Sequence, residues 1–179
     1  MALTVTLPMF IQEYHGASAT TAGVFTASYS IIASLSRAAT GKLVDKVGGG
    51  KCIICGLMSI LFGSIIFALS PEIDPYTFYM IGGLFFLAFG AGFTNAAVYQ
   101  WIPEVIRRGR SQTGGLISCI GAFGGFIIPF ILGNVRDTFN KGAVRGFFAY
   151  TFFSVVGIGV TSYLIWHLEI EKQKRDTHQ

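Results

Sequence analysis

The sequence predicts an all-α integral membrane protein. Of its 179 residues, 52% are hydrophobic and only 12% are charged, whereas soluble proteins carry about 25% charged residues. The mean hydropathy is +0.59, and the charges are separated by long uncharged runs. A soluble domain of this size would need more charged residues to cover its surface, so the composition indicates helices embedded in a bilayer.

Six uncharged runs predict the helices in chain order. A membrane-spanning helix needs about 20 residues, and the last five runs reach that length. The first run has 12 residues and is expected to be the second half of a helix whose start is missing. The prediction is therefore five full transmembrane helices plus one partial N-terminal helix. The runs are 1–12, 16–36, 52–71, 75–103, 111–135 and 146–168.

The connections between these runs predict the orientation. The connections lie alternately on two sides of the membrane. One side carries Glu13, then the short loop "LSPEIDPYT" with Glu72 and Asp74, then one loop of mixed charge, and the other side is rich in lysine and arginine. Cytoplasmic loops carry an excess of lysine and arginine, so we expect a multi-pass protein of the inner (plasma) membrane with a cytoplasmic C-terminus. Nine of the thirteen basic residues lie on the predicted cytoplasmic side: Lys42, Lys46, Lys51, Arg107, Arg108, Arg110, Lys172, Lys174 and Arg175.

The run "GGLISCIGAFGGFIIP", residues 114–129, places five glycines in an apolar segment. Each glycine costs about 1 kcal/mol relative to alanine in a water-exposed helix. Gly114, Ser118, Gly121 and Gly125 fall on one stripe at helical spacing. Small residues let membrane helices approach closely, so one interpretation is helix packing alone. The other is that bare backbone lines a substrate path.

One arginine follows a long uncharged run. Arg37 comes directly after residues 16–36 and eight residues before Asp45, which is about 12 Å along a helix. A charge at membrane depth is costly and is by default a functional hypothesis. The alternative is that the long side chain extends to the interface.

The glycine run resembles the second nitrate signature of the nitrate/nitrite porter family, within the major facilitator superfamily. The match follows the pattern G-x5-G-x2-GG-x3-P, with Gly115, Gly121, Gly124, Gly125 and Pro129. The stretch "SLSRAATGKLVDKVGGGK" resembles the end of the family's eighth helix and its cytoplasmic loop, and "FGAGFTNAAVYQWIPEV" resembles its tenth helix. The resemblance implies a major-facilitator-type C-terminal bundle of helices 7 to 12 over residues 1–170, with helix 7 entered midway, and a cytoplasmic tail over residues 171–179.

The resemblance also implies a substrate site. Arg37 matches the family's substrate-binding arginine, and a flat guanidinium can donate paired hydrogen bonds to a flat anion such as nitrate. Ser118 is expected either to bond the anion or to bond its own helix backbone, and Tyr29 either to wall the path or to pack. Bare backbone would line the path at four glycines of the signature: Gly115, Gly121, Gly124 and Gly125.

A second implied element is a cytoplasmic gating loop. The segment "GKLVDKVGG" resembles the C-terminal copy of the superfamily's loop motif, and the resemblance suggests that it helps to hold one face of the transporter closed. The residues assigned to this loop are Gly41, Asp45, Gly48 and Gly49.

The implied function is transport of nitrate or nitrite by alternating access, in nitrate assimilation, with a separate N-terminal six-helix half as partner. No carboxylate lies within the predicted spans, which favours an antiporter exchanging nitrate and nitrite over proton symport. Two alternatives stay open: a non-transporting membrane fragment of a split or broken gene, and a facilitator for another small anion.

Other classes of protein are not indicated by the sequence. Cys52 and Cys55 form a C-x-x-C pair with no second pair for zinc. The sequence shows no nucleophile–base pair, phosphate loop or basic stripe with interleaved aromatics. We therefore expect no enzyme activity, no cofactor or metal and no nucleic-acid partner.

Overall fold

A computed structural model describes residues 2–68, 78–105, 110–138 and 142–176, and these residues fold almost entirely into six α-helices. The predicted all-α class is confirmed. The helices are α1 (Ala2–His15), α2 (Ala19–Val47), α3 (Gly49–Ala68), α4 (Phe78–Val105), α5 (Arg110–Thr138) and α6 (Gly142–Asp176).

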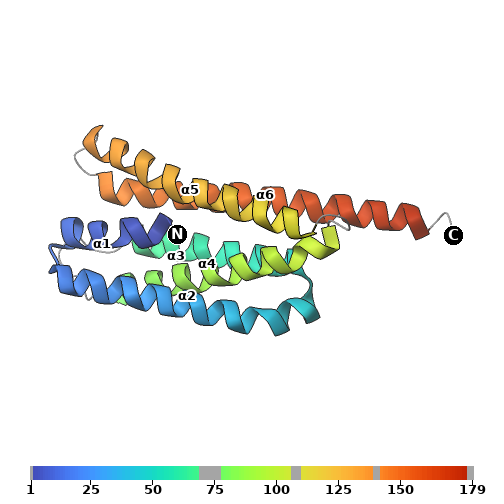
Figure 1. Cartoon of the computed structure of the whole chain (residues 1–179). Coiled ribbons are helices and arrows are strands. Elements are labelled where there is room, and N and C mark those ends of the chain that lie inside the picture. Colours follow the sequence, from blue (N-terminus) through green and yellow to red (C-terminus); the bar gives the residue numbers. More distant parts are fainter. Residues whose placement is uncertain (1, 69–77, 106–109, 139–141, 177–179) are drawn as a thin grey trace.

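The helices lie side by side along one common axis (Figure 1). α4 packs against α3 along much of its length and also against α2, while α6 packs against α3. α5 runs beside α6 along one edge of the bundle, and α2 forms the opposite edge. A cluster of buried side chains joins α1, α2 and α4; its largest members are Leu7, Phe10, Ile11, Tyr29, Met80, Leu84 and Leu87.

α2 extends further than the uncharged run predicts. It begins after Ser18, whose side-chain oxygen accepts a hydrogen bond from the Thr21 amide at 3.2 Å, and it continues through Val47 rather than ending near residue 36. Gly48 ends the helix with φ +93°, a conformation that glycine adopts without strain. Asp45, predicted to lie in a cytoplasmic loop, is therefore on a helix, and the turn itself is a single glycine.

Three of the described helices are long and apolar enough to cross a membrane: Gly49–Ile66, Met80–Pro103 and Tyr150–Ile170. α2 and α5 have 29 residues each, which is also sufficient length, but they contain more hydroxyl and glycine residues. α6 continues without a break to Asp176, so the predicted tail at 171–179 begins as helix.

The hydroxyl groups of α2 are compatible with a bilayer because they bond their own helix. Thr26 donates to the Ala22 carbonyl at 2.9 Å, and Thr40 donates to the Ser36 carbonyl at 2.6 Å. Such bonds satisfy a side-chain donor without water. The low hydropathy of α2 therefore does not leave unsatisfied hydroxyls at these positions.

Four glycines of α3 and α4 permit close helix packing, and we call them the packed glycines: Gly56, Gly63, Gly90 and Gly92. A Cβ on Gly90 would lie 2.7 Å from the Gly56 carbonyl oxygen and 2.9 Å from the Ile60 amide nitrogen of α3. A Cβ on Gly92 would collide with the Ala33 carbonyl and the Ser36 side chain of α2. Because these obstacles include backbone atoms, a larger residue would force the helices apart.

Candidate functional site

Arg37 lies on α2 with its side chain exposed, between the buried residues Ser36 and Thr40. Within the described part of the chain, no hydrogen bond or ion pair involves its guanidinium. The five donors of an arginine are therefore available to a ligand. The helix places this charge ten residues before its end at Val47, which is about 15 Å along the axis.

Contacts between α2 and α4 fix the depth of Arg37. Gly92 of α4 meets Ala33 and Ser36, and a Cβ on Gly41 would lie 3.2 Å from Nε2 of Gln100. The two helices run in the same direction, so Arg37 lies at about the level of residue 96 in α4.

The glycines of α5 have different surroundings from the packed glycines. A Cβ added at any of three of them would meet no atom within 4 Å. The neighbouring side chains Leu116, Ile120 and Phe123 are also exposed. We call these three open glycines the glycine ridge: Gly114, Gly115 and Gly121.

The remaining glycines of the predicted motif give less information. Gly125 is half-buried, and the surroundings of Gly124 fall outside the described residues. Both lie on α5. The ridge is therefore defined by the part of the motif nearer the start of α5.

Ser118 stands on the same helix and joins it to α4. Its hydroxyl donates to the Gly114 carbonyl at 2.9 Å, and its oxygen lies 2.7 Å from the hydroxyl oxygen of Tyr99. A serine has one proton to donate, so Tyr99 is the donor in the second bond. Of the two interpretations of Ser118, bonding to its own helix backbone is the one that the geometry favours.

The Tyr99–Ser118 contact also fixes the depth of the ridge. α5 runs opposite to α4 (Figure 1), so Gly121, three residues after Ser118, lies near the level of residue 96 in α4. This is the level of Arg37. α4 separates the two, because it lies between α2 and α5 and contacts both. The structure thus brings Arg37 and Gly121 to one depth on opposite flanks of α4.

Tyr29 occupies a different environment from Arg37. Its side chain is 6% exposed and belongs to the buried cluster of α1, α2 and α4. Packing therefore accounts for its position.

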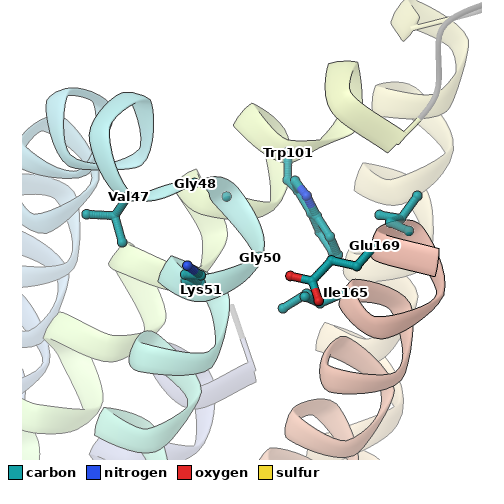
Figure 2. A pocket seen from close by; sticks show the side chains of 9 residues that line it. Val47, Gly48, Gly50, Lys51, Trp101, Ile165 and Glu169 are labelled. Carbon is teal, nitrogen blue, oxygen red and sulfur yellow. The ribbon is translucent and has the colours of Figure 1, made fainter. Parts of the chain in front are cut away.

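The predicted gating residues lie at the end of the bundle that includes the C-terminal part of α6. Gly48 and Gly49 line a cavity of about 210 Å³ together with Trp101 of α4 and Glu169 of α6. Figure 2 shows the indole of Trp101 standing over the turn between α2 and α3. A Cβ on Gly49 would lie 2.6 Å from Cβ of Trp101, so the turn approaches the indole only because residue 49 is glycine.

The same cavity shows that the helix ends next to the three basic segments lie close together. The turn between α2 and α3, the end of α4 and the end of α6 all contribute to it. Lys46 and Lys51 flank this turn and are exposed. The alternation of basic connections in the sequence therefore corresponds to one end of the bundle.

Sequence reasoning missed Tyr99. The residue is exposed on α4 and lies four residues after the exposed Asn95, so the two polar side chains share a face of a largely apolar helix. This i, i+4 spacing of polar residues was the available signal. The described residues contain no group of histidine, cysteine or acidic side chains that could hold a metal ion.

Comparison with known proteins identifies relatives over the whole chain. The family model of the Major Facilitator Superfamily matches residues 1–178. A nitrite extrusion protein of Bacillus subtilis (strain 168) is 30% identical over 179 residues, which is 100% of this chain and 43% of that protein. No solved structure matches the chain.

More distant relatives carry a related description. A probable nitrate transporter NarT of Staphylococcus carnosus is 22% identical over 90% of this chain and 39% of that protein. The corresponding protein of Staphylococcus epidermidis is 22% identical over 83% of this chain and 37% of its own length. The chain thus spans less than half the length of these curated relatives, and the predicted resemblance to nitrate and nitrite porters is confirmed.

Proposed function

Because this chain belongs to the Major Facilitator Superfamily, a family of transporters, we propose that it forms the C-terminal half of a nitrate or nitrite transporter. Relatives described as a nitrite extrusion protein and as nitrate transporters support the choice of substrate. Three parts of this proposal are additional to family membership: the substrate, the second half and the orientation with the C-terminus in the cytoplasm.

The observation that carries the proposal is the shared depth of Arg37 and Gly121, the deepest member of the glycine ridge. A guanidinium for which the described residues provide no hydrogen bond or ion pair lies at the level of Gly121, where a Cβ would meet no described atom within 4 Å. A charge held in a membrane helix without a partner needs a compensating group. A small anion supplies that charge, and a residue without a side chain leaves room for it to pass.

The chemistry of the two partners agrees. Nitrate and nitrite are flat anions with several oxygen acceptors, and a guanidinium presents a planar fork of donors that stays charged at any working pH. Charge-assisted hydrogen bonds of this kind are roughly twice as strong as neutral ones. Arg37 would thus bind and orient the anion, and the exposed backbone of α5 would form part of the wall on the other flank of α4.

Transport by alternating access needs a second body against which this half moves. In our proposal an N-terminal six-helix half covers the ridge and the exposed face of α2. The tight turn at Gly48 and Gly49, held under Trp101, would serve as a rigid contact at the cytoplasmic end. Asp45, exposed on the last turns of α2, is available to pair with the other half.

Exchange of nitrate for nitrite accounts best for the charges of this half. The carboxylates of described helices whose surroundings are defined, Asp45 and Glu169, are exposed near helix ends. Neither lies at the depth of Arg37, so neither is placed to carry a proton through the site. A bound anion of one species would instead be replaced by one of the other.

Counterflow in vesicles tests the proposal. Proteoliposomes would be loaded with nitrite and given labelled nitrate, with this chain reconstituted alone and together with an N-terminal six-helix half. We expect uptake only with both halves and only with a trans anion. Uptake of another small anion but not of nitrate or nitrite would support the alternative facilitator, and the absence of any anion flux with both halves would favour the non-transporting fragment.

A further inference from the structure

We infer that Tyr99 is a positioning residue that ties α5 to α4 and sets Gly121 of the glycine ridge at the level of Arg37. The inference deepens the proposed function and rests on it for the role in transport. The tie itself is independent of that function. It consists of the hydrogen bond between the Tyr99 hydroxyl and Ser118 Oγ at 2.7 Å.

The direction of this bond follows from the neighbouring one. Ser118 gives its only proton to the Gly114 carbonyl, so the phenol of Tyr99 donates to the serine oxygen. The result is a chain of two hydrogen bonds that begins on α4 and ends on the backbone of the ridge. Hydrogen bonds of this kind between membrane helices contribute to helix association.

The position of the tie gives it a consequence for the site. Tyr99 lies three residues, or about 4.5 Å, beyond the level that Arg37 and Gly121 share. Because the hydrogen bond is this close to Gly121 along the helix axis, it leaves α5 little freedom to slide or rotate at Gly121. Tyr99 therefore acts through Ser118 and α5 rather than by contact with the anion, since its proton is already donated.

α5 also packs against α6 and α1, but the face that carries the ridge is not closely packed. A Cβ on any ridge glycine would meet no atom within 4 Å, so on this face no interdigitation of side chains fixes the register of α5. By contrast, α3 and α4 are held by three of the packed glycines, Gly56, Gly63 and Gly90, and by the bond from Ser59 Oγ to the Phe86 carbonyl at 3.0 Å. A directional hydrogen bond between α4 and α5 supplies the register that packing supplies between α3 and α4.

The chain contains native reporters for a direct test. Cys55 on α3 and Cys119 on α5 are exposed, and Cys52 is buried. In a Cys52→Ala background, nitroxide labels on the two exposed thiols report the distance between α3 and α5 by pulsed electron paramagnetic resonance. This measurement requires no transport activity, so it separates the tie from the proposed function.

We expect the Tyr99→Phe variant to broaden the distance distribution between the two labels, because the substitution removes only the hydroxyl. Tyr163→Phe is the matched control, since Tyr163 is an exposed tyrosine on α6 and its substitution should leave the distribution unchanged. An unaltered distribution in Tyr99→Phe overturns the inference.

Transport supplies the second arm of the test. In the complete transporter, Tyr99→Phe should raise the KM for nitrate about fivefold, which corresponds to the net contribution of one hydrogen bond. The Vmax should change less than twofold. Ser118→Ala should have a similar effect, and the double variant no more than either single one. Additive effects, or a larger effect of Ser118→Ala alone, would assign Ser118 to the anion and overturn the positioning role. A broadened distance distribution without nitrate transport in the parent protein would leave the tie in place and refute the function.

Discussion

The packed glycines of α3 and α4 and the glycine ridge of α5 have different roles in the same bundle. A Cβ on Gly63 would lie 2.7 Å from the Leu87 amide nitrogen and 2.9 Å from the Gly83 carbonyl oxygen, whereas a Cβ on Gly121 would meet nothing within 4 Å. The first kind of glycine allows two helices to touch. The second kind leaves a backbone surface open.

This difference teaches that a glycine-rich membrane helix has no single meaning. Close packing within this half accounts for the packed glycines, but it does not account for the glycine ridge. No described residue packs closely on the ridge, and an anion path beside a second half is our explanation for it. The first three substitutions below change a packed glycine, a ridge glycine or Arg37 on the other flank of α4. Each is compared with a control substitution at a position with different surroundings.

The largest effect is expected for Gly92→Ala. The new methyl group would collide with the Ala33 carbonyl of α2, and overpacking of this kind costs about 1–3 kcal/mol. We expect a clear fall in the melting temperature of the purified protein in detergent. Gly82→Ala on the same helix is the control, because a Cβ there meets open space; it should leave the melting temperature unchanged or raise it. Equal melting temperatures of the two variants would remove the distinction between packed and open glycines.

Arg37→Lys should have the next largest effect, and on transport rather than on stability. Lysine keeps the charge but loses the paired donors, and hydrogen bonds to charged groups contribute about 1.5–3 kcal/mol. The rate of nitrate uptake at a nitrate concentration well below KM should therefore fall about 10- to 100-fold. The control is Lys46→Arg near the end of α2, which should transport normally. Normal uptake by Arg37→Lys would show that the guanidinium does not bind the substrate.

Gly121→Leu sharpens the comparison from the other side. The leucine side chain would enter the space beside the ridge, so uptake should fall about tenfold while the melting temperature stays within about 2 °C of the parent. Gly23→Leu, at an open position of α2, should affect neither quantity. A large loss of stability in Gly121→Leu would mean that another surface packs on the ridge.

Gly49→Ala is expected to have the smallest effect. Its Cβ would lie 2.6 Å from Cβ and 2.8 Å from Cγ and Cδ1 of Trp101. The ring can turn away, and both Cβ atoms lie near helix ends, where a small backbone shift relieves the remaining contact. We expect a two- to threefold loss of uptake and a stability loss of about 1 kcal/mol. Trp101→Gly in the same protein should restore much of the loss, because it removes both the indole and the Cβ that a methyl group at residue 49 would meet. If the double variant is no better than Gly49→Ala, the turn is not held by the indole.

Much of the fold could be predicted from the sequence, because lipid leaves few solutions. Uncharged runs located the six helices, and alternating basic connections correspond to one end of the bundle. The predicted end of α2 was wrong, because Lys42, Asp45 and Lys46 were expected to mark a loop and instead lie on the helix. Long charged side chains are compatible with a helix that continues beyond the membrane, and charge alone therefore does not mark a helix end.

The candidate site could be predicted only in part. The spacing of Gly114, Ser118 and Gly121 predicts a shared face, but spacing does not reveal whether that face meets a helix or open space. The link from Tyr99 to Ser118 depends on how α4 and α5 are placed relative to each other. No pattern within either helix determines that placement, so the residue that joins them appeared only with the fold.

The central claim is that the glycine ridge borders a water-filled anion path, and one labelling measurement tests it most directly. In a variant of the complete transporter with the three native cysteines replaced and Gly121 changed to cysteine, the thiol is exposed to a membrane-impermeant, negatively charged thiosulfonate reagent. We predict that the thiol reacts, and that added nitrate slows the reaction several-fold. A thiol that is inert to this reagent but reacts with a lipid-soluble maleimide would place the ridge against acyl chains and contradict the account.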